Sequence, residues 1–509
     1  MNGAAGDFSA ILGDELVECR GTAREFSGAF SSDSRRVVPG GVFIAVPGVR
    51  VDGHRFIADA VAAGASVVLH RDPLREYDPA VTYLRCRNTA RARALLARFA
   101  AGDPGRRLAL FGVTGTNGKT TTAFLLEAIL NGSGRRCGLL STVEYRDGGA
   151  AAHPATHTTP DSETIYRELA AMCDNGCAAA AMELSSHSLD QERAFGLRFR
   201  CAIFTNLTGD HLDYHGTMEA YFAAKRRLFT ELIADGGAAV LNFDDPAGLR
   251  LGRELAARGD CRVIGFGSSD AAREMGAWRI AEVSAASAGG SAFLLVSPDG
   301  ENAYEVASNL VGEHNVRNLT GALLAALDFG ISPAELDRVL AAPIAVPGRL
   351  ELFRSPSGAS FYVDYAHTDD AIRRVLEALR PLTAGRLAIV FGAGGDRDRT
   401  KRPRMGRAAG ELADRIYLTS DNPRSEEPLA IMREIAAGIP DGVPVVAEAD
   451  RRTALRRAAA DAGPGDVVLV AGKGHEDYQE IKGVRRHYSD REFLRELFGT
   501  PTAENQWNP

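Results

Sequence analysis

The residues best suited to chemistry form the run Gly-Val-Thr-Gly-Thr-Asn-Gly-Lys-Thr-Thr-Thr at positions 112–122. An apolar segment, 108–111, precedes it and a helical pattern follows at 123–130, which predicts a strand, a glycine-rich turn and a helix start. Such a turn directs backbone N–H groups at an anion, while Lys119 adds positive charge and Thr120 offers a hydroxyl to Mg²⁺. The common P-loop pattern has glycine where this chain has Val113, but the flanking strand and helix favour the same interpretation. We therefore predict an ATP site.

Two more segments place carboxylates and histidines directly after predicted strands. Glu183 ends the apolar run 178–182, and His211 lies in segment 205–215, which holds two histidines and two aspartates. Ligands of open parallel sheets bind beyond the carboxyl ends of strands, so Glu183 is placed to supply an oxygen to Mg²⁺. Alternatively, Glu183 begins a helix, and 205–215 is a solvated helix start. The nearby phosphate loop favours magnesium over zinc for the histidines.

Length, composition and net charge limit the classes of protein to which this chain can belong. A chain of 509 residues exceeds one hydrophobic core and predicts about three domains. The net charge of −7 offers no broad basic surface, so we expect no nucleic-acid partner. Seven scattered cysteines give neither a disulfide framework nor a zinc site. No apolar stretch approaches about eighteen residues and no signal peptide is evident, so we expect no membrane insertion and a cytoplasmic location.

The alternation of apolar runs and helical patterns predicts three α/β domains, at 1–107, 108–345 and 346–509. The first is a small unit with a helix at 56–65 and a strand at 65–69. The central domain should carry the phosphate loop on a mostly parallel sheet and end in a linker at 343–347. Its other expected strands are 178–184, 199–206 and 238–243.

The third domain should be a doubly wound, Rossmann-like α/β domain. It has a helical pattern at 451–462, and the tail 500–509 is expected to be disordered. The expected strands of this domain are 361–365, 387–391, 415–419, 443–447 and 467–471.

Motifs spread in order over nearly the whole chain resemble those of the Mur ligase family. The first group is Gly115-Thr-Asn-Gly-Lys-Thr-Thr121, Met182-Glu-Leu-Ser-Ser-His187, Asn206-Leu-Thr-Gly-Asp-His-Leu-Asp-Tyr-His-Gly216 and Tyr221-Phe-Ala-Ala-Lys225. The second group is Asp364-Tyr-Ala-His367, Gly394-Gly-Asp-Arg-Asp398 and Asp421-Asn-Pro-Arg424. The second group is similar to that of family members that add meso-2,6-diaminopimelate.

The resemblance implies an ATP-dependent amide ligase of cytoplasmic peptidoglycan precursor synthesis. Its substrates would be UDP-N-acetylmuramoyl-L-alanyl-D-glutamate, meso-2,6-diaminopimelate and ATP, and a monomer is expected. ATP would phosphorylate the D-glutamyl carboxylate, and the diaminopimelate amine would attack the acyl phosphate. Lys119 and Mg²⁺ would neutralise the crowded negative charge.

Residue roles follow from the matched motifs. The implied magnesium ligands are Thr120, Glu183 and His211, and the implied catalytic residues are Lys119, Lys225, His211 and Glu183. The implied ATP contacts are Gly115, Thr116, Asn117, Gly118, Lys119, Thr120, Thr121, Asn315, Arg349 and Asp364. The implied contacts to the UDP-muramoyl dipeptide are Ser34, Thr158, Thr159, Ser185, Gln191 and Arg193, with 49–51 near the uridine end. The implied diaminopimelate contacts are Arg397, Asp421, Asn422, Pro423, Arg424, Gly472 and Glu476.

Lys225 is a separate case. In similar enzymes this lysine is carbamylated, and the resulting anion supports a magnesium site. From periodicity alone, Lys225 would be a lysine on a solvated helix face. The sequence also departs from the family pattern at Asp369, where proline is usual, but aspartate suits a first helical turn equally well.

Two competing functions remain at this point. One is another amide ligase of the same superfamily, adding L-lysine, a dipeptide or glutamate; the segment 421–424 discriminates against it. The other is a regulatory or scaffold protein built on an inactive ligase. It would be expected to have lost some of Lys119, Glu183, His211 and Lys225, which are all present.

Overall fold

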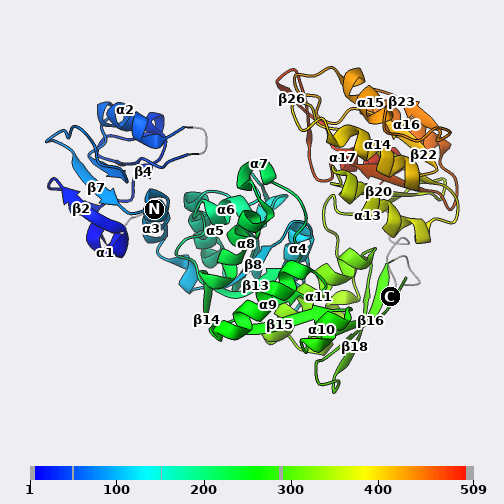
Figure 1. Cartoon of the computed structure of the whole chain (residues 1–509), viewed down its shortest axis with the longest axis horizontal. Coiled ribbons are helices and arrows are strands. Elements are labelled where there is room, and N and C mark those ends of the chain that lie inside the picture. Colours follow the sequence, from blue (N-terminus) through cyan, green and yellow to red (C-terminus); the bar gives the residue numbers. More distant parts are fainter. Residues whose placement is uncertain (1–5, 49–50, 151, 286–289, 500–509) are drawn as a thin grey trace. The chain divides into compact units, whose positions relative to one another are not determined.

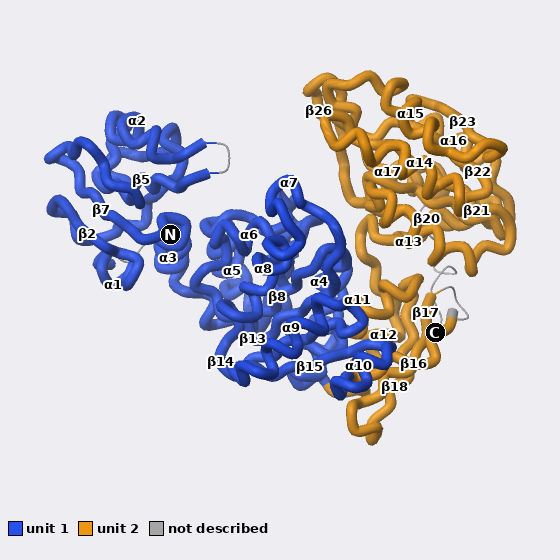
Figure 2. The backbone as a smooth tube through the Cα atoms, in the orientation of Figure 1, with its two compact units in different colours: residues 1–277, 321–331 blue, residues 278–320, 332–509 orange. Residues whose placement is uncertain are grey.

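The computed structural model describes residues 6–48, 51–150, 152–285 and 290–499. The chain forms two compact units, one of residues 1–277 and 321–331 and the other of residues 278–320 and 332–509 (Figure 2). Each unit contains helices and mostly parallel sheets, so the predicted α/β class is confirmed. The division into three domains at 107/108 and 345/346 stays a prediction. Among the described residues, none of the helices is long and apolar enough to cross a membrane.

The N-terminal part of the first unit carries a five-stranded sheet (Figure 1). Strands β4 to β7 are parallel, and β2 pairs with β7 as an antiparallel edge. The order across this sheet is β2 (Leu16–Arg20), β7 (Thr82–Cys86), β6 (Val67–His70), β5 (Val42–Ile44) and β4 (Phe30–Ser31). The associated helices are α1 (Phe8–Leu12), α2 (Ile57–Ala62) and α3 (Thr89–Ala100), and β1 (Gly6–Asp7) pairs with β3 (Glu25–Phe26).

The second sheet of this unit positions the phosphate loop. Its central strands are parallel, while β10 and β11 extend one side as antiparallel strands that the sequence did not predict. The order is β11 (Ala152–Pro154), β10 (Glu144–Arg146), β9 (Cys137–Leu140), β12 (Ala179–Glu183), β8 (Ala109–Thr114), β13 (Phe199–Phe204), β14 (Ile233–Asn242) and β15 (Arg262–Gly267).

Helices connect these parallel strands, as a parallel sheet requires. Helix α4 packs against β9 and β12, and α8 packs against β8 and β14. The helices of this part are α4 (Lys119–Gly132), α5 (Ser162–Asp174), α6 (Ser186–Asp190), α7 (Leu212–His215), α8 (Met218–Thr230), α9 (Pro246–Arg258) and α10 (Asp270–Glu274). The residues of α11 (Glu313–Asp328) are divided between the two units.

The second unit contains the antiparallel strands β16 (Trp278–Ala285), β17 (Ser291–Val296) and β18 (Ala303–Ser308), and a separate six-stranded sheet. That sheet has the order β19 (Glu351–Arg354), β20 (Ser360–Asp364), β24 (Val467–Ala471), β21 (Leu387–Phe391), β22 (Arg415–Leu418) and β23 (Val445–Ala447). A hairpin, β25 (Tyr478–Ile481) and β26 (Val484–His487), follows β24.

Alternate residues of β21 belong to two different hydrophobic cores. Leu387, Ile389 and Phe391 lie in one core, and Ala388 and Val390 in the other. Side chains of a strand point alternately to opposite faces, so helices cover both faces and the predicted doubly wound domain is confirmed. The helices of this unit are α12 (Pro333–Leu340), α13 (Asp369–Leu379), α14 (Lys401–Leu412), α15 (Pro428–Ala436), α16 (Arg451–Asp461) and α17 (Asp490–Phe498).

Candidate active site

The phosphate loop joins β8 to α4, as the sequence predicted. Gly115 has φ +152°, and a Cβ there would collide with the hydroxyl of Thr205. Gly118 has a left-handed backbone, φ +85°, and caps α4. Both positions therefore require glycine. The turn is a preformed feature of the fold.

Contacts to the segment that follows β13 hold this loop in place. The Thr116 backbone N–H donates to the Asn206 carbonyl at 2.9 Å, and the Asn117 N–H donates to Asn206 Oδ1 at 2.9 Å. Thr205 Oγ1 donates to the Asn117 carbonyl at 2.6 Å. Lys119 Nζ folds back onto the loop and donates to the carbonyls of Gly115 and Thr116, at 3.0 and 2.9 Å. Its positive charge is thus kept at the turn.

The predicted magnesium ligands Thr120 and Glu183 meet at the carboxyl ends of β8 and β12. Thr120 Oγ1 donates to Glu183 Oε2 at 3.1 Å, and both residues are buried. Glu183 is the last residue of β12, and α6 begins at Ser186 with Ser185 as its cap. The alternative in which Glu183 starts a helix is therefore wrong. A buried carboxylate beside a hydroxyl is the oxygen-donor set that a hard divalent cation prefers.

Thr142 connects this pair to residues predicted to contact the muramoyl dipeptide. Its backbone N–H donates to Glu183 Oε1 at 2.8 Å, and its hydroxyl lies 3.2 Å from Glu183 Oε2 and 3.1 Å from Thr158 Oγ1. Thr159 Oγ1 donates to the Glu183 carbonyl at 2.7 Å and accepts from the Ser185 N–H at 3.0 Å. The sequence analysis missed Thr142, because it lies in a short loop after β9 with no motif of its own.

Arg193 extends the same network. Its Nη1 donates to the Thr159 carbonyl at 2.7 Å, and its Nη2 donates to Gln191 Oε1 at 2.7 Å. Gln191 Nε2 in turn donates to Tyr214 Oη at 3.3 Å. The structure therefore brings Thr158 and Thr159 together with Ser185, Gln191 and Arg193, a second group more than twenty residues further along the chain.

His211 is the cap residue of the one-turn helix α7 and has φ +54°. Its ring lies 4.9 Å from the His187 ring and 6.1 Å from the Tyr221 ring, measured between centroids. Burial lowers the pKa of His211, and the positive charge of Lys119 lowers it further against the opposing effect of Asp210. A neutral imidazole is the form that ligates a metal. The structure thus places His211 near the phosphate loop in a form suited to its predicted role.

Lys225 is not on a solvated face. The side chain of this α8 residue is 1% exposed, and its Nζ donates to the Gly115 carbonyl at 2.7 Å. Burial holds the pKa of Lys225 well below its usual range, and Lys119 lowers it further. The alternative drawn from periodicity is therefore wrong, and Lys225 lies directly behind the phosphate loop.

The second unit holds the other residues predicted to bind ATP. The Asp364 carboxylate accepts the Leu350 and Ala366 N–H groups, at 2.9 and 2.8 Å, and burial raises its pKa. The Arg349 guanidinium lies 4.9 Å from the centroid of the Tyr365 ring. Asn315 Nδ2 donates to the Val311 carbonyl at 2.9 Å. Their role toward ATP stays a prediction.

The residues predicted to bind diaminopimelate converge at the carboxyl ends of β21, β22 and β24. Arg424, with φ +51°, donates through Nη1 to the Gly395 carbonyl at 2.7 Å. Asn422 Nδ2 donates to Glu476 Oε2 at 2.8 Å. A Cβ on Gly472 would come within 2.6 Å of Asp421 Oδ2, so that carboxylate lies against the glycine. Arg397 and Pro423 flank Gly394 and Gly395, respectively.

Ser34 begins a short 3₁₀ helix, Ser34–Arg36, next to the cap residue Asp33. Of the predicted uridine-end segment 49–51, Val49 and Arg50 lie outside the described residues. The contacts assigned to Ser34 and to this segment stay predictions.

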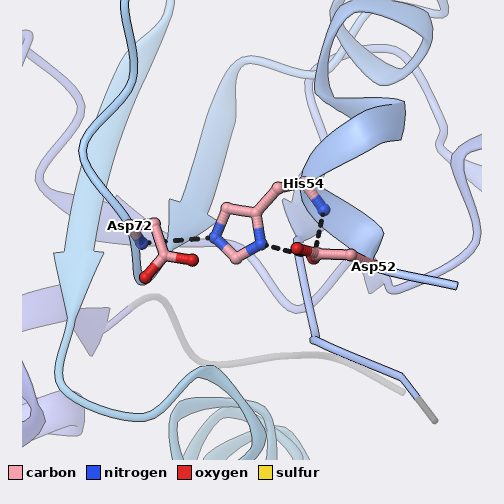
Figure 3. Close-up of side chains that lie close together, drawn as sticks. All are labelled: Asp52, His54 and Asp72. Atoms are coloured by element: carbon pink, nitrogen blue, oxygen red, sulfur yellow. Dashed lines mark hydrogen bonds and ion pairs between the residues drawn. The ribbon is translucent and has the colours of Figure 1, made fainter.

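Within the described residues, Asp52, His54 and Asp72 form the one group whose ligand atoms lie within 4.8 Å of one another (Figure 3). Both ring nitrogens of His54 are already hydrogen-bonded. Nε2 accepts the Arg71 and Asp72 N–H groups at 3.0 and 3.3 Å, which leaves the proton on Nδ1 to donate to Asp52 Oδ1 at 2.7 Å. The Nε2 lone pair therefore faces backbone donors, and His54 joins two loops instead of binding a metal.

Comparisons with known proteins identify the family of this chain. Three family models match the chain: the Mur ligase family catalytic domain over residues 29–103, the Mur ligase middle domain over 113–326, and the Mur ligase glutamate ligase domain over 348–474. A Chlorobaculum tepidum protein named UDP-N-acetylmuramoyl-L-alanyl-D-glutamate–2,6-diaminopimelate ligase is 46% identical over 501 residues, which cover 97% of this chain and 96% of that protein. A protein of the same name from Synechococcus elongatus is 45% identical and covers 91% of this chain and 92% of its own length.

A solved structure of a UDP-N-acetylmuramoyl-L-alanyl-D-glutamate–2,6-diaminopimelate ligase is similar over 97% of this chain and 99% of its own, with a TM-score of 0.68 and 34% identity. The family models, the full-length relatives and this structure all indicate one family. The chain therefore belongs to the Mur ligase family.

Proposed function

We propose that this protein uses ATP to join meso-2,6-diaminopimelate to the D-glutamyl carboxylate of UDP-N-acetylmuramoyl-L-alanyl-D-glutamate. The observation that carries the proposal is the continuous hydrogen-bonded path from Thr120 of the phosphate loop, through Glu183 and Thr142, to Thr158. It supports a binding mode in which the phosphate end of one substrate lies beside the other substrate. The names of the full-length relatives support the same reaction.

The chemistry proceeds in two steps. A D-glutamyl carboxylate oxygen attacks the γ-phosphorus of ATP, so that a new O–P bond forms and ADP leaves with the electron pair of the broken bond. The diaminopimelate amine then attacks the acyl carbon, phosphate leaves, and the amine loses a proton. The protein's contribution to both steps is positioning and charge neutralisation.

Residues of the first unit account for this contribution. The backbone N–H groups at the start of α4 and the Lys119 ammonium stabilise the charge on the transferred phosphoryl group. Arg193 and the hydroxyls of Thr158 and Thr159 orient the dipeptide, because their partners already fix their directions. Thr120, Glu183 and neutral His211 fit a magnesium ion. When bound, Mg²⁺ supplies charge neutralisation at the phosphates.

The buried Lys225 amine is proposed to react with carbon dioxide. A neutral amine is the nucleophilic form, and burial keeps this one neutral. Its nitrogen attacks the carbon of CO₂ and releases one proton, leaving an N-carboxylate. The residue then changes from a cation to an anion behind the phosphate loop, where it can support the magnesium site.

The remaining assignments belong to the same proposal. Asn315, Arg349 and Asp364 contact ATP, and Ser34 contacts the uridine end of the UDP sugar. Arg397, Asp421, Asn422, Pro423, Arg424, Gly472 and Glu476 contact diaminopimelate. The reaction takes place in the cytoplasm, and the protein acts as a monomer.

The test is an amine-dependence assay. The protein is incubated with the UDP-muramoyl dipeptide, ATP, Mg²⁺ and, separately, meso-diaminopimelate, L-lysine or D-alanyl-D-alanine. We expect phosphate release and a product of the tripeptide mass with diaminopimelate alone. Equal or greater turnover with either other amine would assign a different ligase, and no turnover with any amine would reject the ligase function.

A further inference from the structure

Lys473 is a completely buried ammonium group that the proposed reaction does not use. It follows Gly472 at the end of β24, and its side chain is 0% exposed. Its Nζ donates to the Tyr478 carbonyl at 2.7 Å and to Asn422 Oδ1 at 3.2 Å, and it lies 3.4 Å from Glu476 Oε2. Burying a lysine is costly unless it is paired, so these contacts define a built site.

Two of these partners are residues assigned to the amino-acid substrate. Glu476 Oε2 accepts from both Lys473 and Asn422, so these two donors fix the direction of its carboxylate. Asn422 Oδ1 also accepts the Glu480 backbone N–H at 3.0 Å. Lys473 thus links the strand-end segment 421–424 to the turn that carries Glu476.

The charges around Lys473 complement one incoming ammonium group. Glu476 and Asp421 are two carboxylates close enough for Asp421 to affect the pKa of Glu476, and Lys473 is the cation beside them. Two ionised carboxylates and one ammonium carry a net charge of −1, which a single substrate ammonium would neutralise. A closed site with balanced charge avoids the cost of burying a net charge.

We propose that Lys473 is a positioning residue for amino-acid recognition: it holds the Glu476 carboxylate ionised and oriented to accept the distal ammonium of the incoming diamino acid. Lys473 itself does not contact the substrate. This inference rests on the proposed function. A neutral or rotated Glu476 would lose that ammonium contact.

The surroundings of Glu476 give the proposal a pH signature. Burial raises the pKa of Glu476, Lys473 lowers it and Asp421 raises it. Tyr365 and Tyr478 are ionisable groups that also interact with Glu476. Lys473 also faces the rings of Tyr478 and Tyr488, and its charge lowers the pKa of Asp490. Removing Lys473 should therefore raise the pKa of Glu476, so that Glu476 becomes protonated as the pH falls.

The experiment compares Lys473→Met with the wild-type protein in the full ligation assay from about pH 6 to about pH 9. We expect the Michaelis constant for diaminopimelate to rise about ten- to a hundredfold near pH 7, the typical effect of losing a charged hydrogen bond. The ratio of the variant constant to the wild-type constant should grow as the pH falls, and the Michaelis constant for ATP should stay unchanged. Lys482→Met, at an exposed lysine of the following hairpin, is the matched control.

Two further variants separate positioning from packing. Lys473→Gln keeps hydrogen-bond donors but lacks the charge, so it should show the same pH-dependent ratio. In a Glu476→Gln background, Lys473→Met should cause little additional change, because the carboxylate that it serves is absent.

A loss that is independent of pH, or one that is equally large in the Glu476→Gln background, would overturn the proposal. Failure of both single variants to fold would assign Lys473 to the stability of the domain and would also overturn it. The wild-type amine-dependence assay tests the proposed function separately, because it requires no change at Lys473.

Discussion

The side-chain nitrogen of Lys225 lies 2.7 Å from the backbone oxygen of Gly115, inside the turn that carries Lys119. Two lysines thus converge on one loop, and Lys119 is one cause of the low pKa of Lys225. Lys119 is suited to remain a cation, and Lys225 is not.

Lys225→Met should inactivate the enzyme. It should also fold more stably than wild-type protein whose Lys225 is not carbamylated. Below the usual lysine pKa of 10.5 the unfolded chain binds a proton that the folded protein excludes, so burying the amine costs about 1.4 kcal/mol per pH unit. In carbonate-free buffer, the stability advantage of the variant should therefore increase as the pH falls from 10.5 toward the folded-state pKa. Thermal melting across this range measures it. A variant that melts below the wild type at neutral pH would contradict the assignment of a neutral buried amine.

Lys225→Ala should be nearly inactive but partly restored by added short carboxylates, if the modified side chain acts as an anion. The alanine leaves a space behind the loop where a small carboxylate can bind. Turnover with and without formate or acetate measures the rescue. The same salts given to Lys119→Ala are the control, because a missing cation cannot be replaced by an anion.

Lys119→Ala should abolish ligation while the protein stays folded. The lysine contacts two loop carbonyls and not the core, so its loss should cost about 3 kcal/mol or more in the barrier, roughly a hundredfold in rate. The phosphate-release assay together with circular dichroism checks both halves of the expectation. The exposed Lys482→Ala change is the control. Near-normal turnover of a folded Lys119 variant would reject the phosphate-loop assignment.

Arg424→Ala should raise the Michaelis constant for diaminopimelate far more than that for ATP. A guanidinium binds a carboxylate through two parallel hydrogen bonds, and losing such a pair in a closed site costs about 2 to 5 kcal/mol. Its loss should also weaken the preference for diaminopimelate over lysine, which lacks that carboxylate. Arg433→Ala, at an exposed residue of α15, is the matched control. Should Arg424→Ala keep the wild-type preference, the specificity assignment fails while the ligase assignment stands.

Asp490→Asn should destabilise the strand ends next to the diaminopimelate residues. Asp490 and Arg451 are a fully buried pair, 2.7 Å apart, and Arg451 also donates to the Ala471 carbonyl just before Gly472. Breaking a buried pair costs about 3–5 kcal/mol because one charge is left unpaired. Burial raises the pKa of Asp490, but Arg451 and Tyr488 bring it below 3.8. The ionised carboxylate therefore contributes fully to the stability of the fold above pH 3.8. That contribution is lost as the pH falls through the lowered pKa. Hydrogen exchange of β22 and β24 measures the loss, with the exposed Asp441→Asn as control.

The sequence predicted the site best where the functional residues and the elements that carry them follow one another closely along the chain. The turn at 115–118 could be predicted because strand, glycines, lysine and helix follow one another within a few residues. The start of β14 at Ile233 could not be predicted, because a pair of glycines such as Gly236 and Gly237 usually indicates a turn. The register shift between Phe199 and Cys201 shows that the pairing is irregular there.

The parts that could not be predicted depend on three-dimensional packing. The helical pattern around Lys225 did not indicate burial, because Arg226 and Arg227 follow it directly, as on a solvated helix face. Thr142 and Lys473 each find partners in segments distant in the sequence, which a single sequence does not reveal. The Glu183 alternative was undecidable locally, since strand end and helix start are only three residues apart.

The Thr142 hydroxyl has one proton and two acceptors within reach, Glu183 Oε2 at 3.2 Å and Thr158 Oγ1 at 3.1 Å. It can donate to only one of them at a time. While Glu183 Oε2 can accept a hydrogen bond, the Thr142 proton is directed at that carboxylate. Once that oxygen binds another group, the proton can turn to Thr158 Oγ1. A group bound at Glu183 Oε2 would then leave the Thr142 proton directed at Thr158. A single hydroxyl rotor thereby couples the hydrogen bonding of Thr158 to the engagement of Glu183.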